Sequence, residues 1–133
     1  MRKFHLEIVT PDGPEFEGYA ESLLVKTKDG DVEILAGHAD YIAAVDTGRV
    51  RIISEGSSRF ASANGGFLSV SANEAKLVCI TFEFKEDIDL KRAEAAKLKA
   101  EESLSNAKDE RAIELATAKL KRAISRINVA SLR

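Results

Sequence analysis

Up to about residue 84, the chain is made of short runs in which apolar and polar residues alternate. The first run, FHLEI at residues 4–8, is followed by TPDGPEFEG, whose two prolines and Asp-Gly pair are expected to interrupt it. Further runs are ESLLVKT, GRVRIIS, RFASAN and FLSVSA, separated by KDGD, EGSS and a pair of glycines. Alternation with a period of two is typical of strands with one buried face. Short strands without intervening helices predict an antiparallel β-sandwich or a flattened barrel.

The last alternating run, KLVCITFEF at residues 76–84, is expected to be one continuous strand. Strand geometry then divides its side chains between two faces, with Val78, Ile80, Phe82 and Phe84 on one and Leu77, Cys79, Thr81 and Glu83 on the other. Cys79 is the only cysteine of the chain, so it forms no internal disulfide. Its apolar neighbours favour a small buried hydrophobe over a reactive thiol.

From Asp87 onward, the period of the apolar residues changes from 2 to about 3.6, which is typical of amphipathic helices. The two expected apolar stripes, separated by SNAKDE, are Leu90, Ala93, Ala96, Ala100 and Leu104, then Ile113, Ala116, Leu120, Ala123, Ile127 and Ala130. The short connection predicts an antiparallel hairpin of two helices of roughly 18 residues each. Alanine buries little area, so the hairpin alone is marginal and able to exchange one supporting surface for another. We therefore expect an α+β chain with a β-sandwich domain at 1–85 and a helical hairpin at 86–133.

The composition agrees with a folded protein, with 44% hydrophobic and 32% charged residues. No apolar run approaches the roughly 18 residues of a membrane span, and the N-terminal residues lack the apolar stretch of a signal peptide. We therefore expect a cytoplasmic location and no direct membrane span. The net charge is −2, but residues 111–133 hold six Lys or Arg and one Glu. Such a basic segment suits an anionic partner, although a solvated helix face is the commoner role of these charges.

The chain contains only partial matches to the residue patterns of known enzymes and metal sites. GPEFEG has the glycine spacing that opens a phosphate-binding loop, but Tyr19 stands where the lysine belongs. Two histidines, His5 and His38, without CxxC or HExxH provide no zinc ligand set. His38 near Asp40 resembles half of a catalytic triad, yet no serine or cysteine occurs in a nucleophile-like context. A net charge of −2 also lacks the basic footprint of nucleic-acid-binding proteins, so we expect no catalytic residues, no metal site and no nucleic-acid partner.

The stretch KEDIDLKRA at residues 85–93 places three acids where the strand pattern gives way to the helix pattern. Asp87 is predicted to be the N-cap, and Asp89 in the first turn complements the positive end of the helix dipole. Arg92 does not fit this role, because a cation in the first turn opposes the same dipole.

Four cations are expected to gather on one side of the hairpin. Arg92 and Lys99 lie along one face of the first helix, and Arg122 and Arg126 are four apart beside the alanine stripe of the second. An antiparallel hairpin brings the two pairs together, which is costly without an anion, and a polyphosphate would suit them. From composition alone, ordinary surface charge is the commoner explanation of such a cluster.

The motifs VTPDGP, GDVEILAGHA and ANGGFLSV, followed by the alanine-rich hairpin, occur in this order along the chain. With these motifs in this order, the whole chain resembles the epsilon subunits of bacterial F-type ATP synthases. IDLKRA at 88–93 is similar to the I/L-D-x-x-R-A motif with which the epsilon subunits of several bacilli and their relatives bind ATP. The resemblance implies ATP as a regulatory ligand, leaves open whether Mg²⁺ accompanies it, and implies contacts at Glu83, Ile88, Asp89, Arg92, Ala93, Lys99, Arg122 and Arg126.

Two departures from the family pattern affect these expectations. Lys99 stands where related ATP-binding sequences have arginine, and lysine lacks the bidentate fork that holds a phosphate by two bonds. In GDVEILAGH, Glu33 and Ala36 replace the glycine and proline that are more common in the family. This loop faces the membrane rotor ring in the family.

The resemblance implies a non-catalytic subunit of the rotor's central stalk, peripheral at the cytoplasmic face of the cell membrane. The sandwich would bind the gamma subunit and the c-ring. The hairpin would inhibit ATP hydrolysis when extended toward the beta subunit, and bound ATP would stabilise its folded state. Two other hypotheses stay open: a stand-alone nucleotide-binding or transport-adaptor module, and an esterase that uses His38.

Overall fold

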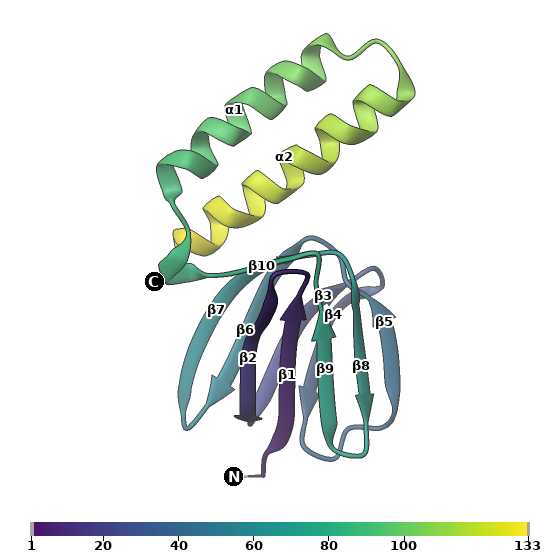
Figure 1. Cartoon of the computed structure of the whole chain (residues 1–133), viewed down its shortest axis with the longest axis vertical. Helices are drawn as coiled ribbons and strands as arrows, with labels where there is room; N and C mark the ends of the chain where they lie inside the picture. The colour runs from purple at the N-terminus through teal and green to yellow at the C-terminus, as the bar shows by residue number, and fades with distance from the viewer. Residues whose placement is uncertain (1, 133) are drawn as a thin grey trace. The chain divides into compact units, whose positions relative to one another are not determined.

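The computed structural model describes residues 2–132 and divides into a strand-rich unit that ends at Phe84 and a helical unit that begins at Lys85 (Figure 1). The boundary falls one residue before the expected one. The first unit contains the strands β1 (Phe4–Thr10), β2 (Gly13–Ala20), β3 (Ser22–Thr27), β4 (Gly30–Leu35), β5 (Tyr41–Ala44), β6 (Gly48–Ser54), β7 (Ser57–Asn64), β8 (Phe67–Ser71), β9 (Glu74–Val78) and β10 (Thr81–Phe84). The second contains the 3-10 helix η1 (Lys85–Asp87) and the helices α1 (Leu90–Asn106) and α2 (Glu110–Ala130).

The strands form two five-stranded sheets, in the orders β2-β1-β9-β8-β5 and β10-β7-β6-β3-β4. The predicted β-sandwich is thereby confirmed. Pairing is antiparallel throughout the described strands except between β1 and β9, which run parallel with Ile8 opposite Leu77. The core between the sheets is built from alternate residues of the strands, and its largest fully buried side chains are Phe4, Leu6, Ile8, Leu23, Ile34, Ile52, Leu68 and Leu77. Burying one such side chain contributes about 1.5–3 kcal/mol, so the sandwich has a substantial core of its own.

The expected single strand at 76–84 is wrong, because the chain crosses from one sheet to the other within it. β9 ends at Val78 in the first sheet and β10 begins at Thr81 in the second. Leu77 and Cys79 are buried before the crossing and Phe82 and Phe84 after it, whereas Ile80 is 61% exposed. The crossing shifts the alternation by one residue, so Ile80 does not share the buried face of Phe82.

The crossing is packed closely against the turn between β7 and β8. Gly66 has φ +87°, and a Cβ atom at this position would lie 1.7 Å from the carbonyl oxygen of Val78. Only glycine satisfies both the left-handed backbone and this approach. The second glycine of ANGG is therefore required by the crossing.

Three further strands were missed or misread in the sequence. The predicted interruption at TPDGPEFEG is confined to a short turn at residues 11–12, after which β2 runs from Gly13. β2 is an edge strand, where the missing N–H of Pro14 is tolerated, and a register shift between Ile8 and Val9 accommodates it. β4 and β5 were not predicted, and each also lies at an edge of its sheet.

The helical unit is an antiparallel hairpin whose two helices are joined by residues 107–109 (Figure 1). Asp109 caps α2, since its carboxylate accepts a hydrogen bond from the N–H of Ala112 at 2.8 Å. The seam buries four alanines that are seven residues apart on each helix: Ala93 and Ala100, Ala116 and Ala123. Neither helix, nor any other within residues 2–132, combines the length and the apolar character needed to cross a membrane.

The buried positions of the two helices differ from the predicted stripes. Ala96 is exposed, Lys97 is half-buried in its place, and Leu90 and Ile113 are 38% and 45% exposed. On α2, Ser125 and Val129 are buried although they lie outside the predicted stripe.

Candidate functional site

The N-terminus of α1 is capped by Asp89, and the prediction that Asp87 is the N-cap is wrong. Asp87 ends η1, whose turn is closed by a 3.2 Å hydrogen bond from the N–H of Ile88 to the carbonyl oxygen of Lys85. Asp89 follows with extended backbone (φ −83°, ψ 102°), and its carboxylate accepts a hydrogen bond from the N–H of Arg92 at 3.1 Å. Glu86 and Asp87 therefore belong to the 3-10 turn, and Asp89, the third acid of KEDIDLKRA, begins the helix.

This cap occupies one oxygen of the exposed Asp89 side chain. The bond to the Arg92 N–H goes to Oδ1, and the main-chain carbonyl of Asp89 accepts from the N–H of Ala93 at 3.0 Å. Within the part of the chain that the structure describes, Oδ2 makes no hydrogen bond. A ligand donor can therefore reach Oδ2 without displacing the cap.

The helical repeat places the four predicted cations on one side of the hairpin. Arg92 and Lys99 share a flank of α1, and Arg122 and Arg126 share a flank of α2. Because the helices run antiparallel, these flanks border the same side of the alanine seam. The start of α1 lies beside the end of α2 (Figure 1), so Arg92 shares one end of the hairpin with Arg122 and Arg126.

Lys99 lies two helical turns further along α1, about 10 Å toward the connection at 1.5 Å per residue. Arg92 and Lys99 are exposed, and Arg122 and Arg126 are half-buried. Among residues 2–132, the side chains of Arg92, Lys99 and Arg122 take part in no ion pair. The hairpin therefore presents three arginines at one end and a lysine further along.

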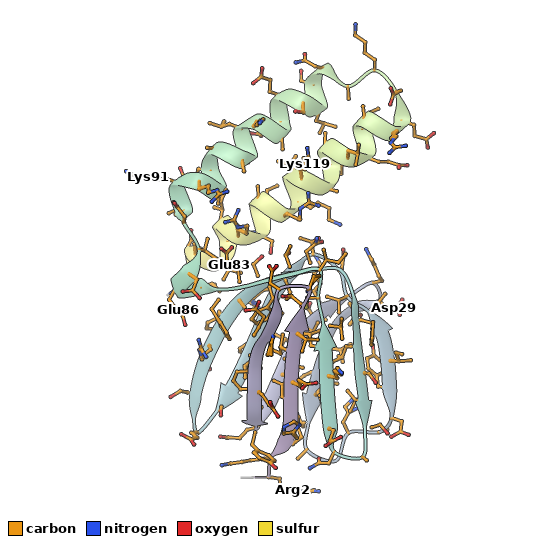
Figure 2. All side chains as sticks on the ribbon, in the orientation of Figure 1. Arg2, Asp29, Glu83, Glu86, Lys91 and Lys119 are labelled. Carbon is orange, nitrogen blue, oxygen red and sulfur yellow. The ribbon has the colours of Figure 1, made fainter. Side chains whose placement is uncertain are left out.

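One further cation on this side was not predicted. Lys119 on α2, labelled in Figure 2, is exposed and precedes Arg122 by three residues and Arg126 by seven. That spacing places it on the same flank, level with the part of α1 that carries Lys99. The periodicity of Lys and Arg along α2 was the signal that would have identified it.

The remaining predicted residues have different surroundings. Ile88 is half-buried between η1 and α1, and Ala93 is fully buried in the seam. Glu83 is half-buried in β10, opposite Ser62 of β7, in the unit that ends at Phe84 (Figure 2). Seven of the eight predicted contacts thus belong to the hairpin and one to the sandwich.

The His38 region does not have the geometry of a catalytic dyad. Nδ1 of His38 lies 2.7 Å from the carbonyl oxygen of Ala39, and its ring contacts Tyr41 edge-on with centroids 5.8 Å apart. The ring nitrogen that a triad would direct at a carboxylate is thus occupied by the backbone. The esterase hypothesis has no geometric support.

Cys79 is buried, as expected. Burial, with a smaller effect from the charge of Glu15, raises the pKa of its thiol to about 12. The thiol is therefore protonated at neutral pH and behaves as a small core residue. In the described part of the chain, no group of three or more His, Cys, Asp or Glu is arranged to hold a metal ion.

Comparison with known proteins assigns both units of the chain. The family described as "ATP synthase, Delta/Epsilon chain, beta-sandwich domain" matches residues 3–85, and "ATP synthase, Delta/Epsilon chain, long alpha-helix domain" matches residues 86–131. The chain is 38% identical over 132 residues to the ATP synthase epsilon chain of Bacillus pumilus and 39% identical over 132 residues to that of Ruminococcus albus. Both alignments cover 98% of this chain and 98% of the relative.

Two solved structures share the fold. A chain of the Euglena gracilis mitochondrial ATP synthase (OSCP/F1/c-ring) matches with a TM-score of 0.82 and 19% identity, over 92% of this chain and 78% of that one. A chain of the Tetrahymena thermophila mitochondrial ATP synthase central stalk and c-ring matches with a TM-score of 0.68 and 14% identity, over 98% of both.

Proposed function

The chain belongs to the ATP synthase epsilon chain family, as a non-catalytic subunit of the central stalk, and we propose that its hairpin is an ATP-responsive inhibitor of ATP hydrolysis. The sandwich seats the subunit on the gamma subunit and, through residues 36–40, on the c-ring. The hairpin has a folded state that binds ATP and an extended state that reaches the beta subunit. The complex works at the membrane, with this chain peripheral on the cytoplasmic face. Since relatives match along the full chain, a stand-alone module is no longer needed to explain it.

The observation that carries this proposal is the arrangement around the N-terminus of α1. Arg92, Arg122 and Arg126 supply three guanidinium groups on one side of the hairpin, where polyphosphate charge is compensated by charge-assisted hydrogen bonds. Oδ2 of Asp89 accepts a hydrogen bond from the adenosine part. Ile88 supplies apolar surface beside it.

The weak alanine seam makes such a ligand effective. A ligand that binds only the folded hairpin stabilises it by mass action, by about 2.7 kcal/mol at a concentration 100 times its Kd. The seam of Ala93, Ala100, Ala116 and Ala123 buries little area. The free-energy difference between the folded and the extended hairpin is therefore small, and ATP binding is sufficient to shift it.

The same arginines also connect ligand binding to inhibition. In the extended state, Lys121, Arg122 and Arg126 face acidic surface of the beta subunit. In the folded state, Arg122 and Arg126 bind phosphate. Because one guanidinium cannot serve both, ATP and the beta subunit compete for this end of α2.

Calorimetric titration and thermal melting of the isolated chain with ATP test the proposal. ATP is expected to bind and to raise the melting temperature of the hairpin, and Arg122→Ala with Arg126→Ala is expected to remove both effects. Lys91→Ala is the matched control, since Lys91 is exposed and the helical repeat places it on the outer face of α1, opposite the alanine seam and away from α2 (Figure 2). An ATP response that persists undiminished in the double variant would contradict the proposed site.

A further inference from the structure

The loop of residues 36–40 connects the two sheets of the sandwich. It leaves β4 at the edge of one sheet and enters β5 at the edge of the other. Its first part is a turn, because the N–H of His38 donates to the carbonyl oxygen of Leu35 at 3.1 Å and Gly37 has φ +79°. This combination is that of a type II turn, in which Ala36 takes the second position and Gly37 the third.

Buried side chains do little to hold this loop. Gly37, Ala39 and Asp40 are exposed, Ala36 and His38 are half-buried, and none of the five belongs to the core between the sheets. A loop with few buried apolar contacts opens at low free-energy cost unless hydrogen bonds hold it. Its position therefore depends on its polar contacts.

Asn73 makes those contacts from the two-residue turn between β8 and β9. Ala72 and Asn73 both have positive φ, 51° and 61°, as a type I′ hairpin turn requires. The side chain of Asn73 accepts a hydrogen bond from the N–H of Gly37 through Oδ1 at 2.9 Å, and donates one to the carbonyl oxygen of Lys3 through Nδ2 at 2.9 Å. Its main-chain carbonyl accepts from the N–H of His5 at 3.1 Å.

One residue thus ties the start of β1 and the β8–β9 turn, both in the first sheet, to the loop that leaves the second sheet. We infer that Asn73 is a positioning residue that holds residues 36–40 in the conformation in which they contact the c-ring. The inference rests on the proposed seat of the sandwich on the c-ring, and it adds the residue on which that contact surface depends. A preordered loop binds more tightly because its ordering cost is already met in the free subunit.

Asn73→Gly is the informative variant. Glycine suits the positive φ of this turn, so the substitution removes both side-chain hydrogen bonds without straining the backbone. Asn73→Asp retains an acceptor for Gly37 and loses the donor to Lys3. Glu55→Gly is the matched control, because Glu55 also has positive φ, 52°, in another turn of the same sandwich.

Water exchange of the Gly37 amide, measured by NMR on the full chain, is the first measurement. Losing the bond to Asn73 is expected to raise this rate about three- to tenfold in Asn73→Gly. The rate should change little in Asn73→Asp and stay at the original value in Glu55→Gly. An unchanged rate in Asn73→Gly would overturn the inference by itself.

Binding of the full chain to an F-type ATP synthase depleted of this subunit is the second measurement. Asn73→Gly is expected to bind about three- to tenfold more weakly, and Ala36→Pro in the same chain should restore binding, because proline prefers the second position of a type II turn. Such a rescue distinguishes loop order from a general loss of sandwich stability.

The outcomes separate this inference from the proposed function. Faster Gly37 exchange with unchanged binding would overturn the positioning role and leave the ATP response of the hairpin intact. An original chain that does not bind the depleted enzyme would overturn both.

Discussion

The carboxylate of Asp89 accepts a hydrogen bond from the backbone N–H of Arg92 at 3.1 Å, so two residues of the candidate ATP site are joined through the first turn of α1. Asp89 fixes the residue at which the helix begins, and it thereby fixes the position of the Arg92 backbone from which that side chain extends. The helix cap and the proposed ATP contact therefore share these two residues, and experiments on either residue have to separate the two roles.

Replacing Asp89 and Arg92 by alanine together is expected to abolish the rise in melting temperature that ATP gives the isolated chain. Asp89→Ala alone should also lower the stability of the hairpin by about 1 kcal/mol through loss of the cap. Asp89→Asn is the control, because asparagine caps equally well and keeps a neutral acceptor. Melting of the three variants with and without ATP, followed by circular dichroism, is the measurement. An ATP response in the double alanine variant equal to that of the original chain would reduce this stretch to a helix cap.

Lys99→Arg is expected to strengthen ATP binding, by up to about tenfold. Arginine offers a planar fork that holds a phosphate by two bonds, whereas lysine offers a point charge. Its longer reach also shortens the gap of about 10 Å that separates position 99 from position 92 along α1. Calorimetry measures the change, with Lys97→Arg as the control, because two residues of helix place Lys97 on the opposite flank of α1 from Lys99. Equal affinities for the original chain and Lys99→Arg would place residue 99 outside the site.

A chain that ends at Lys85 is expected to fold and to retain binding to the gamma subunit, while losing its response to ATP. The sandwich has its own core, including Leu6, Ile8 and Leu77, and all ten strands precede Lys85. Thermal melting and a pull-down with the gamma subunit check this. An insoluble truncated chain would show that the two units fold only as one cooperative structure.

Replacing Lys121, Arg122 and Arg126 by alanine is expected to relieve inhibition of ATP hydrolysis in the assembled enzyme. Inhibition by the original chain should weaken as salt is added, since the Debye length falls from about 10 Å at 0.1 M to 3 Å at 1 M. Hydrolysis rates at low and high salt measure both effects. A triple variant that inhibits as strongly as the original chain at low salt would rule out an electrostatic contact.

The thiol of Cys79 is expected to make the sandwich less stable at alkaline pH. Its folded pKa of about 12 lies above the ordinary thiol pKa of 9.0, so between these values the unfolded chain has lost the proton that the folded chain keeps. Stability from this group is therefore complete below pH 9 and declines toward pH 12, by at most about 1.4 kcal/mol per pH unit. Denaturant unfolding of the original chain and of Cys79→Ala from pH 8 to 11 isolates this contribution. Parallel pH curves for the two proteins would contradict it.

Much of the sandwich was predictable because its buried strands alternate clearly, as GRVRIIS in β6 does. The edge strands were harder. In β4 only Ile34 is buried, and β5 has four residues, too few for a period to show. The crossing at Cys79 and Ile80 was hidden because KLVCITFEF has apolar residues in both phases of its alternation. A change of sheet depends on long-range pairing that local pattern does not contain.

The placement of the four cations was predictable from helix geometry, whereas their role as ATP contacts stays a prediction from the motif. Spacing placed Arg92 and Lys99 on one flank of α1, and the antiparallel connection placed Arg122 and Arg126 on the same side of the hairpin. The choice between Asp87 and Asp89 as the cap depends on a 3-10 turn that the acid-rich sequence does not distinguish. The seam was misplaced at Ala96, because alanine suits both a close contact and an exposed helix face.

The parallel pairing of β1 with β9 determines when this protein can fold during its synthesis. Leu6 and Ile8 pair with Ala75 and Leu77, so the first strand made must wait for nearly the last of the sandwich. At roughly 5–20 residues per second, the ribosome needs on the order of several seconds to make the chain between β1 and β9. During that time β1 lacks one of its two partner strands. The two helices emerge only afterwards. We therefore expect each new subunit to complete the sandwich, with its proposed rotor contacts, before the hairpin that we propose as the inhibitor.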